Sequence, residues 1–168
     1  MKQPILTLVA FLSLISSTSA ADFIAEGRAA LAARHPVEAM AAFTHALEAD
    51  PTNADAAYER GRLLLLIGEP AKAIADFTTA VLAKPDYGRA LAQRGAAKFI
   101  LKSPAEAFAD FDAAIKASPQ DSEVYVIRAT HRLKQRDFTG AKADLRAALP
   151  LADAKTAEDL RMLIGRLD

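Results

Sequence analysis

The chain repeats every 34 residues, without insertion or deletion, from about residue 20 to residue 153. Four columns of residues show this period most clearly. They are Gly27, Gly61 and Gly95; Ala39, Ala73, Ala107 and Ala141; Phe43, Phe77, Phe111 and Leu145; and Pro51, Pro85 and Pro119. A fixed period of this length indicates an array of similar supersecondary units rather than one irregular domain.

A proline near the middle of three of the units divides each of them into two helices. Pro36, Pro70 and Pro104 suit the first turn of a helix, where the missing N–H would have no partner. Proline also disfavours the α conformation of the residue before it, so the preceding helix ends there. Gly68 can adopt the left-handed conformation just past that end. The same place holds a positive charge, which suits a helix C-terminus, at Arg34, Lys102 and Arg136.

These features resemble the tetratricopeptide repeat, a helix–turn–helix unit of the same period. The resemblance implies four units, at about 20–53, 54–87, 88–121 and 122–153. The amphipathic segment 154–168 is predicted to be a C-terminal capping helix. We therefore expect an all-α fold, a right-handed α-solenoid of four units plus this cap. The composition agrees, because Ala, Leu, Glu, Lys and Arg are frequent and favour helices.

Small residues predict close contact between the two helices of a unit. We expect the glycine column, for example Gly61, to face the alanine column at Ala73, with Phe77 filling the seam between neighbouring units. A bulky side chain at Gly61 should then destabilise the fold.

Two charged columns recur together. Arg60, Arg94 and Arg128 form one, and the other is sixteen residues later, at Asp76, Asp110 and Asp144. The first unit lacks both. An ion pair between the two helices of a unit is the favoured interpretation, and an anion site is the alternative. The basic stretch 128–136 likewise indicates either a solvated face or a docking patch for an acidic partner.

The sequence gives little support for catalysis. There is no cysteine, so disulfides and thiolate metal sites are excluded. The three histidines fall at unrelated repeat positions, and no nucleophile elbow, metal-binding spacing or phosphate-binding loop is present. We predict no enzyme activity, catalytic residue, metal or cofactor. The net charge of zero offers no general electrostatic attraction to nucleic acid.

By the resemblance, the first helices of the units line a concave groove that holds a peptide. The groove residues predicted on this basis are Arg28, Tyr58, Arg62, Arg89, Phe99 and Thr130. Ile24 and Glu59 depart from the lysine and asparagine pattern with which some members grip a peptide carboxylate. We expect an interaction scaffold for a protein or peptide, and the arginines would suit an acidic partner. The alternative is a homo-oligomer, a structural subunit of an envelope assembly that self-associates through the alanine-rich first helix.

The first twenty residues have the three-part pattern of a secretory signal. Lys2 precedes an apolar run at 5–15, and small residues follow up to Ala20 and Ala21, after either of which cleavage would fit. The run is short for a membrane span. We expect export without stable membrane insertion after cleavage. In a bacterium this means the periplasm, with the extracellular medium as the alternative.

Overall fold

The computed structural model describes residues 19–167, so the predicted signal sequence lies almost wholly outside the described residues. Its helices are α1 (Ala20–Ala32), α2 (Pro36–Ala49), α3 (Ala54–Leu66), α4 (Pro70–Ala83), α5 (Gly88–Ile100), α6 (Pro104–Ala117), α7 (Ser122–Lys134), α8 (Phe138–Ala148) and α9 (Ala154–Gly165), with a 3₁₀ turn at Leu149–Leu151. No strand occurs between residues 19 and 167.

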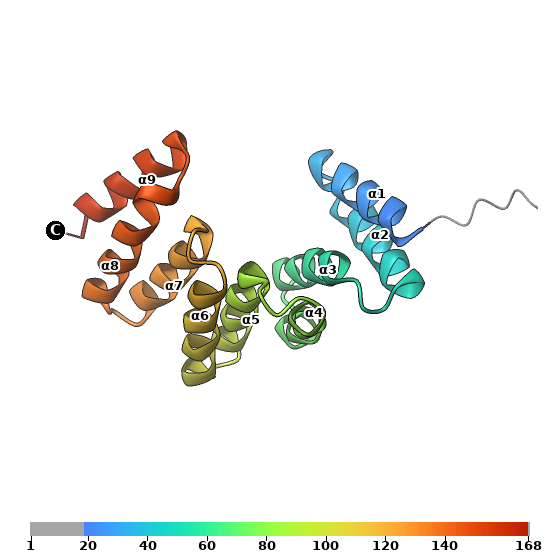
Figure 1. Ribbon diagram of the computed structural model, residues 1–168, viewed down its shortest axis with the longest axis horizontal. Helices are drawn as coiled ribbons and strands as arrows, with labels where there is room; N and C mark the ends of the chain where they lie inside the picture. The colour runs from blue at the N-terminus through green and yellow to red at the C-terminus, as the bar shows by residue number, and fades with distance from the viewer. Residues whose placement is uncertain (1–18, 168) are drawn as a thin grey trace, which may run out of the picture.

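The helix pairs follow one another along an arc, with α1 and α2 at one end and α8 and α9 at the other (Figure 1). The first helix of each pair, α1, α3, α5 or α7, lies on the inner side. At the C-terminal end Leu160 of α9 is buried in a cluster with Leu145 of α8. The predicted all-α solenoid with a terminal helix is confirmed.

The four turns inside the units share one backbone conformation. Gly68 has φ = 81°, and Arg34, Lys102 and Arg136 occupy the same position with φ of 63°, 61° and 63°. A side chain in this left-handed region costs about 1 kcal/mol or more, which glycine avoids. From the sequence we expect only a favourable charge at the three basic positions. The positive φ shows that these residues also adopt a strained backbone conformation.

The glycine column packs against phenylalanine in the first three units, and at Gly95 it also contacts the Ala107 backbone, as expected. A Cβ atom added to Gly61 would lie 2.7 Å from Cε1 of Phe77, and one on Gly27 would lie 2.6 Å from Cε1 of Phe43. The Phe77 ring is fully buried. Each ring therefore packs closely against the first helix of its own unit, where only glycine leaves room.

The paired charged columns form ion pairs between the two helices of a unit, as the favoured interpretation predicts. Nε and Nη2 of Arg60 donate to the two carboxylate oxygens of Asp76 at 2.8 and 2.7 Å. Arg94 and Asp110 repeat this geometry at 2.9 and 2.8 Å. Burial raises the pKa of the Asp110 carboxyl, but hydrogen bonds from Arg94 and Lys98 outweigh it, so the pKa lies below its usual value.

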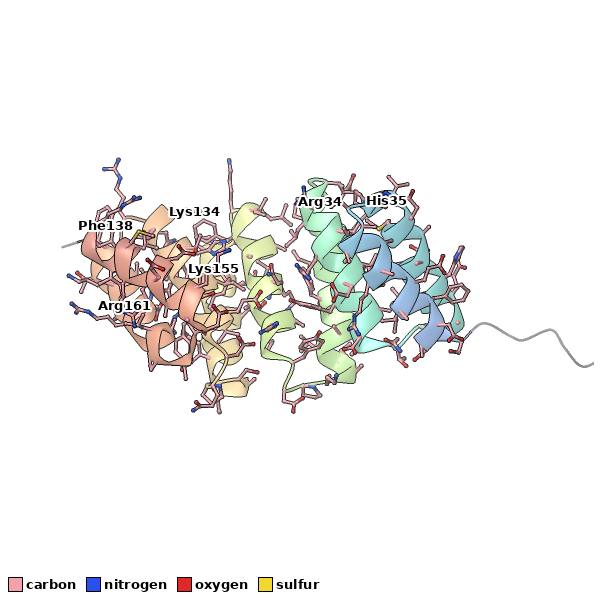
Figure 2. The ribbon with its side chains drawn as sticks, turned by 90° about the horizontal axis from the view of Figure 1, so that it is seen from above. Arg34, His35, Lys134, Phe138, Lys155 and Arg161 are labelled. Carbon is pink, nitrogen blue, oxygen red and sulfur yellow. The ribbon has the colours of Figure 1, made fainter. Side chains whose placement is uncertain are left out.

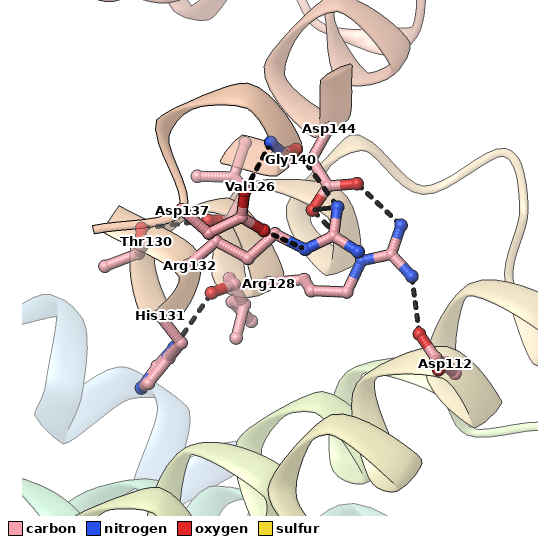
Figure 3. A network of polar contacts seen from close by, with 10 residues as sticks. Asp112, Val126, Arg128, Thr130, His131, Arg132, Asp137, Gly140 and Asp144 are labelled. Atoms are coloured by element: carbon pink, nitrogen blue, oxygen red, sulfur yellow. Dashed lines mark hydrogen bonds and ion pairs between the residues drawn. The ribbon is translucent and has the colours of Figure 1, made fainter. Parts of the chain in front are cut away.

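In the fourth unit this pair belongs to a larger network (Figure 3). Arg128 donates to Asp144 at 3.0 and 2.6 Å and also to Asp112 of the preceding unit at 2.6 Å. Arg132 donates to Asp144 and to the Gly140 carbonyl oxygen, both at 3.0 Å. Two arginines of the basic stretch 128–136 are thus engaged inside the protein and are not a free docking patch.

Candidate functional site

A hollow of about 530 Å³ lies on the inner side of the arc. It brings together four of the six predicted groove residues, and α1, α3 and α5 supply them. These are Arg28, Tyr58, Arg62 and Arg89. Residues from α3, α5, α7 and the loops between units complete its lining. They are Glu59, Tyr87, Gly88, Ser118, Asp121 and Glu123.

Each arginine of the hollow already faces a carboxylate. Arg62 Nη1 lies 3.0 Å from Glu59 Oε2, and Arg28 Nε lies 3.8 Å from Glu59 Oε1. Three arginines and three acidic residues line the hollow, so its formal charge is balanced. The arginine side chains nevertheless remain about half exposed, which leaves part of each guanidinium open to a ligand.

The shortest of these contacts ties the third unit to the loop that leads into the fourth. Nε of Arg89 lies 2.5 Å from Asp121 and 3.1 Å from Glu123. Hydrogen bonding to Asp121 raises the pKa of Arg89. Burial raises the pKa of the Asp121 carboxyl, but the hydrogen bond from Arg89 outweighs this effect. The pKa of Asp121 therefore lies below its usual value. The loop before α7 is therefore tied to the start of α5.

Two tyrosines, Tyr58 and Tyr87, form the aromatic floor of the hollow. The rings of Tyr58 and Tyr87 lie 4.8 Å apart between centroids, and the Arg62 guanidinium carbon lies 5.7 Å from the centre of the Tyr58 ring. Burial, followed by the nearby charge of Glu123, raises the pKa of Tyr58 to about 12. Only 5% of Tyr58 is exposed. The ring is thus part of the floor of the hollow, while its neighbouring arginines provide the accessible surface.

The other two predicted groove residues lie outside this hollow. Phe99, near the C-terminal end of α5, is half-buried and packs edge-on against His131 of α7, with centroids 4.9 Å apart. Thr130 of α7 is exposed, and its hydroxyl donates to the Val126 carbonyl oxygen at 2.8 Å. Four of the predicted groove residues therefore lie together in the hollow, and Phe99 and Thr130 lie outside it.

Sequence reasoning missed two of the three carboxylates, Asp121 and Glu123, and the second tyrosine of the hollow. Asp121 and Tyr87 lie in loops between units, and the resemblance draws attention only to the first helices. One signal was available. Asp121 lies 32 residues after Arg89, close to one period, so neighbouring units bring such positions together.

The arrangement offers polar and aromatic groups for binding a ligand. Within residues 19–167 no group of three or more His, Asp or Glu side chains is placed to hold a metal ion. The charged groups of the hollow act as hydrogen-bond donors and acceptors beside an aromatic floor. Over the same residues no helix has both the length and the apolar character needed to cross a bilayer.

The class of protein follows from the fold together with the family matches. Two models described as tetratricopeptide repeat match residues 42–75 and 67–122. Residues 42–122 are therefore similar to tetratricopeptide repeats, in agreement with the resemblance. No curated protein sequence matches the chain.

Among solved structures, the chain is similar to both tetratricopeptide domains of Spaghetti (RPAP3), each bound to the HSP90 peptide SRMEEVD. The first is 26% identical with a TM-score of 0.61, covering 71% of this chain and 90% of that one. The second is 27% identical with a TM-score of 0.57, covering 59% and 92%. MamA is 18% identical with a TM-score of 0.67, covering 81% and 80%, and supports the fold alone.

Proposed function

We propose that the protein is a scaffold whose groove binds an extended segment of a partner protein, seated at the hollow of Arg28, Arg62 and Arg89. The observation that carries the proposal is the convergence of three half-exposed arginines from three units on one hollow with an aromatic floor. Similar domains of Spaghetti are bound to a peptide that ends in acidic residues.

The balanced charge of the hollow defines how such a segment would bind. A carboxylate on the partner would share a guanidinium with Glu59, Asp121 or Glu123, which hold the arginines in place beforehand. Arginine forms two parallel hydrogen bonds with a carboxylate, so this exchange conserves good geometry. A segment that carries carboxylates beside an apolar side chain fits both the arginines and the tyrosine floor.

Peptide selection tests the groove directly. Peptides are selected from a random library on the wild-type protein, and their affinity is then measured for the variant Arg62→Glu/Arg89→Glu. Arg146→Glu/Arg161→Glu is the matched control, because it makes the same charge change on exposed residues of α8 and α9. We expect at least a tenfold loss with the groove variant only. Equal affinity for wild type and the groove variant would reject this site.

We also propose that the chain is exported to the periplasm and that residues 1–20 are its signal. The charged start, the apolar run and the small residues before Ala21 support this. Mass spectrometry of the protein isolated from fractionated cells provides the test. We expect a first residue at Ala21 or Asp22 in the periplasmic fraction. A cytoplasmic protein that retains Met1 would contradict export.

Self-association remains a second candidate function, favoured by a charge gradient along the arc. The first unit has more acidic than basic residues: two arginines, Arg28 and Arg34, and five carboxylates, at Asp22, Glu26, Glu38, Glu48 and Asp50. Residues 122–167 have the opposite excess, with nine Lys and Arg and six Asp and Glu. In α3, Arg60 is partly buried and Leu63 is buried. The equivalent residues of α1, Glu26 and Ala29, are exposed. This face of α1 therefore has no neighbouring unit to cover it. Opposite charges at the two ends favour head-to-tail contact between copies.

Light scattering over a range of protein and salt concentrations tests this second candidate. We expect association that weakens with salt and is lost in Glu26→Lys, while Asp86→Lys in the second unit leaves it unchanged. A monomer at all concentrations would remove head-to-tail assembly from consideration.

A further inference from the structure

One edge of the solenoid combines exposed apolar side chains with basic ones. The C-terminal ends of α1, α3, α5 and α7 and the starts of their partner helices all lie at this edge. Eight large apolar side chains are strongly exposed between residues 19 and 167, and six of them are here. They are Val37, Leu66, Ile67, Ile100, Leu101 and Phe138.

Four cations lie at the same turns. They are Arg34, Lys102, Lys134 and Arg136, and none of them forms an ion pair within the described residues. We call this set of apolar and basic side chains the turn rim. Arg34 and His35 from the first turn, and Lys134 and Phe138 from the fourth, lie along the same long edge in Figure 2.

Three acidic residues of these turns already have a cationic neighbour. The N···O distances are 3.4 Å for Glu69 and Lys72, 3.7 Å for Glu106 and Lys98, and 3.6 Å for Asp137 and Arg132. The fourth, Glu38, lies 4.0 Å from His35, which is charged only when protonated, so Glu38 offsets one of the four cations. The turn rim therefore presents a net positive charge, together with apolar side chains.

We propose that the turn rim docks on the surface of an anionic lipid bilayer. Leucine, isoleucine and phenylalanine side chains enter the boundary between headgroups and acyl chains, and lysine and arginine attract anionic headgroups. The charge complementarity favours a bilayer over a second copy of the chain, because a copy's turn rim would bring like charges together. The groove opens on the inner side of the arc rather than at this edge, so a docked protein keeps its hollow accessible.

Vesicle sedimentation tests the charged part of the proposal. The vesicles consist of phosphatidylcholine with or without phosphatidylglycerol. We expect binding only with phosphatidylglycerol, and a loss of about tenfold or more in Lys134→Glu/Arg136→Glu. Lys116→Glu/Arg146→Glu makes the same charge change on exposed residues away from the turn rim and should bind nearly as wild type. Wild type and variants are prepared in the same mature form, without the proposed signal 1–20, so the comparison isolates the turn rim.

The apolar part has its own matched pair. Leu66→Ser should weaken vesicle binding several-fold, whereas Leu82→Ser, at an equally exposed position outside the turn rim, should not. Because the chain has no cysteine, a polarity-sensitive dye can also be attached at Phe138→Cys or at Ala147→Cys. We expect a blue shift on vesicle addition at position 138 only. Failure of wild type to bind, or equal losses within both matched pairs, would overturn the proposal.

Discussion

The groove and the turn rim use the same kinds of residue in opposite ways. In the groove, Arg62 and Arg89 are held by carboxylates at 3.0 and 2.5 Å, and the aromatic floor is buried. At the turn rim, Lys102 and Arg136 have no ion pair within the described residues, and Leu66 is 76% exposed. Preorganised donors favour recognition of one geometry, whereas free cations beside exposed apolar groups favour an extended charged surface.

The helix pair is the frame common to both surfaces, and it offers the largest effect. Gly61→Leu places a side chain where even a Cβ would be 2.7 Å from the Phe77 ring. We expect a loss of about 3 kcal/mol or more in the free energy of unfolding, measured by urea denaturation. Gly165→Ala meets nothing within 4 Å and should remain near wild type. Equal stability of Gly61→Leu and wild type would refute the packing described for the repeat.

The ion-pair network of the fourth unit should show the next effect. Asp144→Ala leaves Arg128 and Arg132 without their shared buried carboxylate. We expect unfolding to become easier by about 3 kcal/mol. Exposed Asp86→Ala is the control and should change little. Because none of these three residues lines the hollow, a stable fraction of the variant should still bind selected peptides.

The stability of the protein should depend on pH through His131, a buried histidine close to the turn rim. His131 is buried against Phe99 and Phe111, with Nδ1 donating to the Ile127 carbonyl oxygen. Burial, and then the charge of Lys134, lower its pKa below the ordinary 6.5 despite that hydrogen bond. The unfolded chain therefore binds the proton more readily, and stability present above pH 6.5 is lost as pH falls below it.

The expected loss is up to about 1.4 kcal/mol over the first pH unit below this value. His131→Leu should flatten the pH profile, since Leu63 occupies the same repeat position in the second unit. His45→Leu, at an exposed position, should leave the profile as in wild type. A profile of His131→Leu that follows wild type would show that another group is responsible.

The smallest effect belongs to the turn rim alone. Lys102 holds a left-handed conformation with φ = 61°, and glycine occupies this position in the second unit. Lys102→Gly should stabilise the protein by about 0.5 kcal/mol in chemical denaturation. Lys116→Gly, inside α6, should have the opposite sign, with a loss of about 0.5–1 kcal/mol. Destabilisation by both changes would contradict the assigned strain.

The sequence predicted features that recur in most units. The proline positions indicated three of the helix pairs, and the joint appearance of Arg60 with Asp76 indicated the ion pair that the structure contains. What it could not predict depends on neighbouring units. The register between units decides that Arg89 meets Asp121 and that His131 covers Phe99. The sequence indicated the left-handed turn only at Gly68. The other three units have a basic residue at this position, and a basic residue does not by itself indicate a positive φ.

The most direct test of two independent binding surfaces measures both ligands on both variants. The groove variant Arg62→Glu/Arg89→Glu and the turn-rim variant Lys134→Glu/Arg136→Glu are each titrated with a peptide selected on wild type and with phosphatidylglycerol vesicles. We predict that the groove variant loses only peptide binding and the turn-rim variant loses only vesicle binding. Loss of both ligands in either correctly folded variant would contradict the separation of the two surfaces.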